Sequence, residues 1–236
     1  RMNPAPSNIN SSYYDQSDYY KKNAAHLLDF KSRFQRYRVR KLREIYDPNV
    51  EETVLDLGCG WGTLCWSLAN RVQHITGLDF SETSIRLCNE RLQGESYANV
   101  TFIQGDARGT EMPSETYDLV IAADLFEHLY PNDSDKVTRE VFRLLKSQGR
   151  FSIWTPNRSH IIEILKNRNI LFRKDETHVD YKSMRKLLKM LEEAGFVVEK
   201  HYYAESHIPF FRHIERIFLR FLPPFRRRIA ILAYKP

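Results

Sequence analysis

The chain has 236 residues, of which 42% are hydrophobic and 28% charged, a composition typical of one globular domain. No apolar run approaches the roughly 18 residues that a transmembrane helix requires, and no signal-peptide pattern is present, which favours a cytoplasmic protein. The three cysteines show neither a Cys-x-x-Cys pair nor a histidine at zinc-ligand spacing, so we expect reduced thiols and no bound metal.

The first part of the chain changes character twice. Residues 1–12 are polar and contain two prolines, which predicts a disordered tail. Apolar residues then recur at helical spacing over 27–46, which predicts a helix before the turn at Asp47-Pro48.

Short apolar runs alternate with helical stretches from residue 53 to residue 156. The runs cover 54–56, 74–79, 100–106, 117–123 and 149–155, and the helical stretches include 63–71 and 134–145. Strands and helices in this alternation predict an α/β fold, a doubly wound parallel sheet with helices on both faces. In such sheets ligands bind beyond the carboxyl ends of the strands.

The alternation is less regular after residue 157. The pattern predicts a helix-like insertion over 159–174, a helix over 181–194 that Gly195 ends, and strands over 196–204 and 228–234.

A glycine-rich loop follows the first strand, in the sequence Thr-Val-Leu-Asp-Leu-Gly-Cys-Gly-Trp-Gly of residues 53–62. Gly58, Gly60 and Gly62 permit a tight turn and a close approach of the backbone to a ligand. The predicted helix after them would direct its N-terminus at the loop, which favours an anionic group. We therefore expect a cofactor here.

Acidic residues stand at the ends of three successive strands. Asp79 is placed to accept hydrogen bonds from a ribose diol, and Phe80 could pack on a purine. Asp106 could accept a hydrogen bond from an exocyclic amine. Thr63 stands where the dinucleotide fingerprint expects a small residue, so the loop favours a nucleoside without a pyrophosphate. The alternatives are a helix-capping Asp79, a turn-forming Asp106 and a core Phe80.

These motifs resemble those of the class I S-adenosylmethionine-dependent methyltransferases over roughly residues 13–236. Val-Leu-Asp-Leu-Gly-Cys-Gly-Trp-Gly, Gly-Leu-Asp-Phe-Ser and Gln-Gly-Asp-Ala resemble the first three motifs of the family. The segment Phe-Ser-Ile-Trp-Thr-Pro-Asn of 151–157 is similar to the branch that contains ubiquinone-biosynthesis O-methyltransferases. The resemblance implies a seven-stranded, mostly parallel Rossmann-like sheet with an antiparallel last strand. It also implies one domain over 13–236, with an N-terminal helical cap at 13–47 and a substrate-side insertion at 157–180.

The resemblance also assigns expected roles in binding S-adenosylmethionine, with S-adenosylhomocysteine as the product. The residues expected to hold the cofactor are Asp56, Gly58, Cys59 and Gly60 for the methionine part, Asp79 for the ribose, Phe80, Asp106 and Ala107 for the adenine, Leu125 behind them, and Tyr20, Arg33 or Arg36 from the cap.

The expected reaction is methylation of a hydroxyl on a small apolar or anionic acceptor. A general base assists such a reaction, and His128 is the best-placed candidate because an imidazole titrates near neutral pH. Asp124 and His178 are rivals. The alternative functions are an RNA- or lipid-associated methyltransferase, a nicotinamide-dependent oxidoreductase, and a non-catalytic cofactor-binding regulator.

Most of the net charge of +6 lies at the C-terminus, where residues 201–236 carry seven Lys or Arg and two Glu. Residues 209–224 have the pattern of a basic amphipathic helix, with Phe211, Ile214, Phe218 and Phe221 at helical spacing. One interpretation packs these apolar residues on the sheet, and the other places 209–228 against an anionic membrane. Nucleic acid is not expected, because no RNA-binding module is recognisable.

Overall fold

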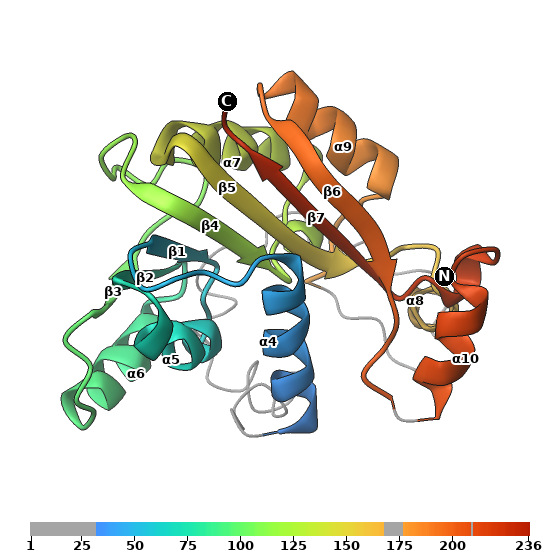
Figure 1. The fold of residues 1–236 in the computed structure, drawn as a ribbon, viewed down its shortest axis with the longest axis horizontal. Coiled ribbons are helices and arrows are strands. Elements are labelled where there is room, and N and C mark those ends of the chain that lie inside the picture. Colours follow the sequence, from blue (N-terminus) through green and yellow to red (C-terminus); the bar gives the residue numbers. More distant parts are fainter. Residues whose placement is uncertain (1–31, 168–176, 209) are drawn as a thin grey trace.

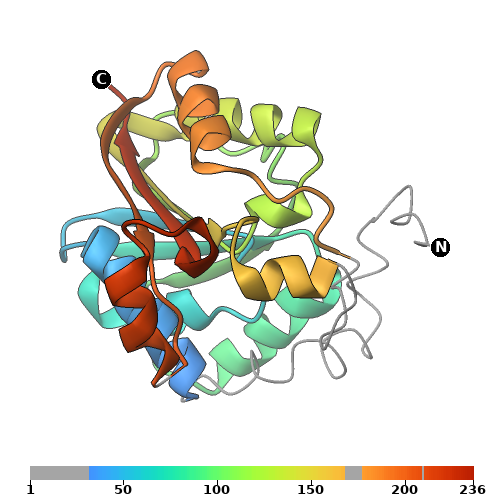
Figure 2. The ribbon, with the colours of Figure 1, turned by 90° about the vertical axis from the view of Figure 1, so that its right-hand side faces the viewer.

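The computed structural model describes residues 32–167, 177–208 and 210–236, which form one seven-stranded sheet covered by helices on both faces (Figures 1 and 2). The strand order is β3-β2-β1-β4-β5-β7-β6. The strands are β1 (Thr53–Leu57), β2 (His74–Asp79), β3 (Val100–Gln104), β4 (Tyr117–Ala123), β5 (Leu145–Pro156), β6 (Val197–Ala204) and β7 (Arg228–Tyr234). The first five are parallel, and β7 runs antiparallel to both of its neighbours. The predicted sheet is thereby confirmed.

Helices α7 and α9 cover one face of the sheet, while α4, α5 and α6 cover the other (Figure 1). The helices are α4 (Arg33–Ile45), α5 (Thr63–Leu68), α6 (Glu82–Gln93), α7 (Pro131–Leu144), α8 (Ile161–Asn167), α9 (Met184–Glu193) and α10 (Phe211–Phe218), with the 3₁₀ turns η1 (Ala69–Arg71), η2 (Phe126–His128) and η3 (Pro223–Phe225). The predicted tail at 1–12 and most of the predicted cap lie outside the described residues.

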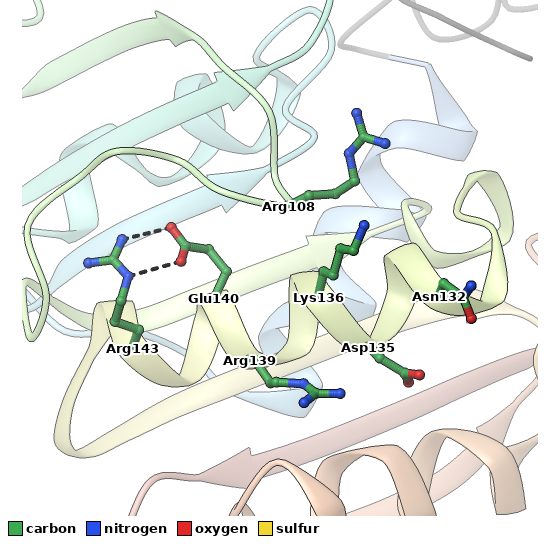
Figure 3. Close-up of a pocket in the computed structure, with 7 residues that line it drawn as sticks. All are labelled: Arg108, Asn132, Asp135, Lys136, Arg139, Glu140 and Arg143. Atoms are coloured by element: carbon green, nitrogen blue, oxygen red, sulfur yellow. Dashed lines mark hydrogen bonds and ion pairs between the residues drawn. The ribbon is translucent and has the colours of Figure 1, made fainter.

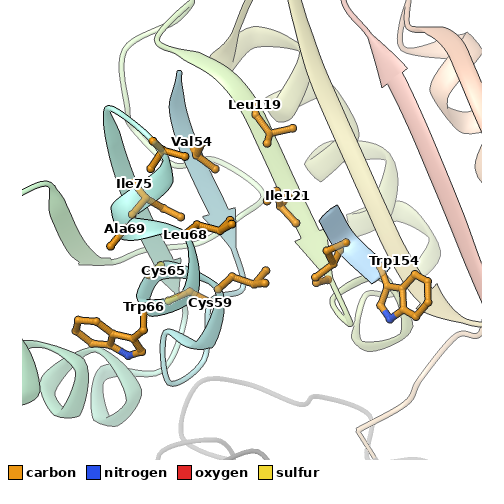
Figure 4. Packing of buried hydrophobic residues seen from close by; sticks show 14 of the residues in the cluster. Val54, Cys59, Cys65, Trp66, Leu68, Ala69, Ile75, Leu119, Ile121 and Trp154 are labelled. Atoms are coloured by element: carbon orange, nitrogen blue, oxygen red, sulfur yellow. The ribbon is translucent and has the colours of Figure 1, made fainter. Parts of the chain in front are cut away.

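The core follows from the alternation of side chains along each strand. Val54 of β1 belongs to the cluster under α4 and α5, whereas Leu55 and Leu57 belong to the cluster under α7 and α9. Figure 4 shows the first cluster, in which Ile75 and Ile121 pack with residues of α5. Both faces of the central strands are buried, and this fixes the register at which the strand ends meet.

Local signals set the helix starts at the functional edge. The Ser81 hydroxyl accepts a hydrogen bond from the Ser84 amide at 3.1 Å and caps α6, and Pro131 begins α7. The cap of α6 is therefore Ser81 and not Asp79.

Helix α10 differs from the prediction that its phenylalanines pack on the sheet. Its single buried residue is Glu215, whereas Ile217 and Phe218 are exposed and Phe211 is half-buried. The predicted apolar stripe does face inward in part, since Phe211 and Ile214 are half-buried and the rings of Phe211 and Phe218 lie 6.4 and 5.3 Å from that of Phe225. Their partner is therefore the η3 turn and not the sheet. Within the described residues, no helix is long and apolar enough to cross a bilayer.

Candidate functional site

The glycine loop turns sharply at the carboxyl end of β1. Gly58, Gly60 and Gly62 have φ angles of 76°, 52° and 72°, a left-handed conformation that favours glycine. The amides of Gly58 and Cys59 both donate to the Leu78 carbonyl, at 2.8 and 3.0 Å. These bonds tie the loop to β2, the strand that carries Asp79.

The Asp79 carboxylate stands at the tip of β2 and bridges two segments. One oxygen accepts a hydrogen bond from the Gly60 amide at 2.8 Å, and the other accepts one from the Ser81 amide at 2.9 Å. The loop and the acid predicted to hold the ribose are thus in direct contact. Phe80 beside them is 36% exposed, so it is not a core residue.

Asp106, after β3, lies on the same edge and is bound to its own loop. Its carboxylate accepts hydrogen bonds from the Arg108 amide and from the Arg108 Nε, both at 2.9 Å. Partial burial acts to raise the pKa of Asp106, but the Arg108 bonds and charge lower it. These bonds are those of a turn-forming residue, which is one of the two roles considered for Asp106. Ala107, the next residue, is half-buried.

Asp56 lies below the loop. It is buried, and burial raises its pKa to about 7 although the Arg38 charge opposes the shift. The Cys65 thiol is 3.7 Å from its carboxylate. The side chain of Asp56 therefore contacts α5, and its predicted contact with a methionine group remains a prediction.

The surroundings of the glycine loop bear on the predicted cofactor site. A Cβ atom placed on Gly60 would meet nothing within 4 Å, which leaves open space above the loop. Leu125 is in contact with the loop, because a Cβ on Gly58 would lie 3.0 Å from the Leu125 Cδ1. Gly60, Asp79 and the exposed Phe80 thus lie together at one end of β1 and β2, and their roles in holding a ribose and an adenine remain predictions.

Asp124 lies immediately after β4, at the carboxyl edge of the sheet, and forms a second cluster of charged side chains there. Arg38 donates from Nε to the Asp124 carboxylate at 2.9 Å and from Nη2 to the Ala123 carbonyl at 2.8 Å, and Arg228 donates to the other carboxylate oxygen. Burial acts to raise the pKa of Asp124, but the charges of Arg228 and Arg38 outweigh it and lower the pKa. Its φ of +59° is unusual for a residue other than glycine.

This environment makes Asp124 a poor general base. A carboxylate held by two arginines has little tendency to take up a proton near neutral pH. The structure therefore does not favour the catalytic role predicted for Asp124, and it indicates instead that the residue positions Arg38 and Arg228.

His128 lies at the end of η2 and contacts His178, which comes from a distant part of the chain. The two ring centroids are 4.8 Å apart in an edge-on arrangement. His128 Nδ1 is 3.1 Å from the Thr177 carbonyl, and His178 Nδ1 is 2.6 Å from the Tyr181 hydroxyl, which in turn donates to Glu163. A carbonyl can only accept, so His128 Nδ1 carries a proton and the neutral ring has its lone pair on Nε2.

Glu127 completes this group of titratable side chains. It is buried and accepts a hydrogen bond from the Thr155 hydroxyl at 2.9 Å, and burial with the nearby Asp124 charge raises its pKa to about 8. One ligand atom from each of Glu127, His128 and His178 lies within 4.8 Å of the others, a spacing that a metal ion could use. The sequence prediction of no metal considered spacing along the chain and did not detect this grouping.

Lys182 fixes the η2 turn from below. Its buried ammonium donates to the carbonyls of Phe126 at 2.6 Å, Asp180 at 3.1 Å and Leu129. Burial lowers its pKa to about 8. The sequence did not predict Lys182, Arg38, Arg228 or Glu127 as site residues, although Glu127 is adjacent to the predicted His128.

The contacts predicted for the cap residues with the cofactor remain predictions. Arg33 and Arg36 are exposed on α4, whereas Arg38 of the same helix reaches Asp124. Tyr20 lies outside the described residues. Helical spacing alone does not predict a role for Arg38, because it does not show which face of α4 lies toward β4.

The cysteines are buried and reduced, as expected. Burial raises the pKa of the Cys59 thiol well above its usual value, so Cys59 is a poor nucleophile.

A basic surface pocket lies elsewhere, along α7. Figure 3 shows its lining residues, in which Arg143 pairs with Glu140 and Arg108 extends from the loop after β3. None of the predicted cofactor residues lines this pocket.

Comparison with known proteins identifies the class of protein to which this chain belongs. A family model described as a methyltransferase domain matches residues 48–195, and the chain therefore belongs to that family.

Individual relatives support the same class. An uncharacterised methyltransferase of Bacillus subtilis, YcgJ, is 29% identical over 137 residues, which is 57% of this chain and 53% of the relative. A ubiquinone biosynthesis O-methyltransferase of Pseudomonas fluorescens is 36% identical over 108 residues, or 45% of each chain. The chain spans about half the length of the curated relatives it matches.

Solved structures share the fold. Phosphoethanolamine N-methyltransferase 2 of Haemonchus contortus, solved in complex with S-adenosyl-L-methionine, aligns with a TM-score of 0.72 at 18% identity, covering 98% of this chain and 61% of that one. The [4+2]-cyclase SpnF aligns with a TM-score of 0.71 at 18% identity, covering 100% of this chain and 99% of that one.

Proposed function

We propose that the protein transfers a methyl group from S-adenosylmethionine to a hydroxyl of a small acceptor that is apolar or anionic. The observation that carries the proposal is the contact between the glycine loop and Asp79, at the edge where the loop also opens to solvent at Gly60. Membership of the methyltransferase family supports this function over a nicotinamide-dependent oxidoreductase, which would share the sheet.

The cofactor would be held by the loop, Asp79 and Phe80 in the roles predicted for them. When bound, S-adenosylmethionine supplies a methyl group already activated by its sulfonium. The protein then has to orient the acceptor and remove one proton, because alignment of the two groups supplies most of the remaining rate enhancement.

His128 is the group proposed to take that proton. The bond from its Nδ1–H to the Thr177 carbonyl orients the ring, and in this tautomer the ring would take up the proton at Nε2. Arg38 and Arg228 lie beside it around Asp124 and would favour an acceptor with negative charge. This charge, together with the ubiquinone relative, supports an oxygen nucleophile on an anionic or polar-headed acceptor.

The reaction is tested by incubating the protein with methyl-labelled S-adenosylmethionine and a metabolite and lipid extract. Label should appear in an acceptor and be lost with His128→Ala. The variant should bind S-adenosylhomocysteine in calorimetry with an affinity close to that of the unmodified protein. His201→Ala, on an exposed strand position, is the matched control. Equal loss of binding and turnover in His128→Ala would remove the base role, and no labelled product in any extract would favour a non-catalytic regulator.

A further inference from the structure

Several apolar side chains of helix α10 and its flanks are exposed to solvent. Ile217 is 66% exposed, and Phe210 and Phe221 at its two ends are 80% and 75% exposed. Phe218 and Leu222 are also exposed. Ile217 and Phe221 lie on one side of the segment, because they are four positions apart and the Phe221 amide continues the helical turn by donating to the Phe218 carbonyl, while Phe210 precedes the helix. Large apolar side chains gathered in this way mark an interaction surface.

The helix is held in place by polar contacts. Glu215 is fully buried, with one carboxylate oxygen 2.9 Å from His160 Nε2 and the other accepting from the Ser206 amide. Arg226 donates to the Leu219 carbonyl at 2.8 Å just after the helix. Ring contacts of Phe211 and Phe218 with Phe225 add to this attachment. The exposed Ile217 and Phe221 side chains are not part of it.

Positive charge lies beside the apolar residues. Arg212, Arg216 and Arg220 recur every four residues and form the neighbouring stripe of the helix. The Arg216 side chain is 54% exposed even though it pairs with Glu205, and Arg220 is exposed. An apolar stripe flanked by arginines is complementary to a bilayer surface with anionic headgroups, since the rings enter the interface and the guanidinium groups remain among the phosphates.

The segment that contains α10 lies close to the candidate site along the chain. This segment connects β6 to β7, and β7 begins with Arg228, which contacts Asp124. Strand β6 is parallel to β5, so α10 lies at the same edge of the sheet as the glycine loop and Asp124. Figures 1 and 2 show α10 beside α8, projecting from that edge.

We propose that the surface formed by Phe210, Ile217, Phe218, Phe221 and Leu222 with Arg212, Arg216 and Arg220 binds the face of a bilayer that contains anionic lipid. We call this the α10 surface. Bound in this way, the protein turns the carboxyl edge of its sheet toward the membrane. An acceptor dissolved in the bilayer would then reach the site without passing through water, a consequence that rests on the proposed function, whereas the binding itself does not.

The test is cosedimentation of the full chain with vesicles, without cofactor or acceptor. One set contains phosphatidylcholine alone, and the other contains about one quarter phosphatidylglycerol. Binding should be strong to the anionic set at about 50 mM salt and weaker at about 150 mM, because screening reduces the attraction of the arginines.

Two variants separate the apolar and charged contributions. Ile217→Ser with Phe221→Ser should reduce partitioning into anionic vesicles by roughly tenfold or more, because both side chains would leave the interface. Arg212→Gln with Arg220→Gln should reduce binding mainly at low salt. Val50→Ser with Val197→Ser is the matched control, since both residues are exposed but lie outside the α10 surface, and it should bind like the unmodified protein.

Binding to neither vesicle set would overturn the proposal, as would equal losses in the α10 and control variants. A concentration-dependent dimer that Ile217→Ser with Phe221→Ser dissociates, without vesicle binding, would assign the surface to a second copy of the chain. Circular dichroism of each variant checks that the fold is retained. Because no methyl transfer is measured, failure here leaves the proposed reaction untouched, and failure of the reaction leaves this result standing.

Discussion

The three glycines of the cofactor loop share a left-handed backbone but differ in what surrounds them. A Cβ on Gly62 would lie 2.8 Å from the Phe102 ring and 2.9 Å from Trp66 Nε1, whereas a Cβ on Gly60 would meet nothing within 4 Å. Gly62 is therefore needed for both its φ angle and its lack of a side chain. Gly60 is needed for its φ angle and for the space that it leaves to a ligand.

Alanine substitution should separate these two requirements. Gly60→Ala should cost about 1–2 kcal/mol of unfolding free energy from its left-handed conformation. Gly62→Ala should cost roughly 2–4 kcal/mol, since the contact with the Phe102 ring adds to the same strain. Urea unfolding measures both values. Gly60→Ala should also weaken S-adenosylhomocysteine binding in calorimetry, and equal stability losses for the two variants would contradict this account.

The Asp124 carboxylate should contribute to stability in a pH-dependent way. Asp124→Asn keeps the shape and tolerates the positive φ, but it leaves Arg38 and Arg228 without their anion, with side chains only 11% and 12% exposed. We expect a loss of about 2–4 kcal/mol at pH 7.

The sign of the pH effect follows from the lowered pKa of Asp124. Its stabilisation is present above the unfolded pKa of about 4 and is lost as the pH falls through the lower folded pKa. The difference between the unmodified protein and Asp124→Asn should therefore shrink on acidification, as measured by chemical unfolding at several pH values. Asp135→Asn, on the exposed side of α7, serves as the control. A difference that grew toward acid would show that the charge is not the cause.

At the scale of elements, the η2 turn depends on a lysine from a different part of the chain. Lys182→Met would remove donors from the carbonyls of Phe126 and Leu129, at a cost of roughly 2–3 kcal/mol. Because His128 belongs to this turn, turnover should fall while S-adenosylhomocysteine affinity stays near normal.

Hydrogen exchange should locate this effect in residues 126–129. Lys186→Met is the matched control, because Lys186 also bonds to Asp180, at 2.9 Å, but is half exposed and does not reach η2. Exchange that is unchanged in η2, or equally increased by both variants, would contradict the positioning role of Lys182.

The elements themselves could be predicted from the sequence because their signals are local. Strand ends with acids, the serine before α6 and Gly195 after α9 mark boundaries within a few residues. The face that a helix buries is a tertiary property. Spacing in α10 correctly indicated an amphipathic helix, but it could not show that Glu215 finds His160 and Ser206 in the interior. For the same reason spacing did not predict that Arg38 contacts Asp124.

The residues of the candidate site also differ in whether their partners lie near to them or far from them along the chain. Gly60 and Asp79, 19 positions apart, belong to adjacent βα units, so a motif could bring them together. Arg228 and Asp124 are 104 positions apart, and His178 comes from a segment whose pattern is irregular. Nothing in the sequence near Asp124 signals that its charge is neutralised by the start of the last strand.

At the scale of the whole molecule, a bound cofactor should stabilise the complete domain. S-adenosylhomocysteine at about 100 times its dissociation constant should add about 2.7 kcal/mol, a rise in melting temperature of roughly 5–10 °C for a chain of this size. Scanning calorimetry measures the shift, with a nicotinamide dinucleotide as the comparison. A shift with the dinucleotide alone would reverse the choice between the two cofactor classes.

The place of β7 bears on how the protein comes to be folded during synthesis. It follows the other six strands of the sheet along the chain, yet it lies between β5 and β6 and hydrogen-bonds to both. Until it emerges from the ribosome, β5 and β6 each present an open edge, which invites pairing with other chains. During this interval Asp124 also lacks its contact with Arg228. Completion of the sheet and addition of the second arginine to Asp124 thus depend on the same strand, and a chain halted before β7 would be both unfinished and prone to aggregate.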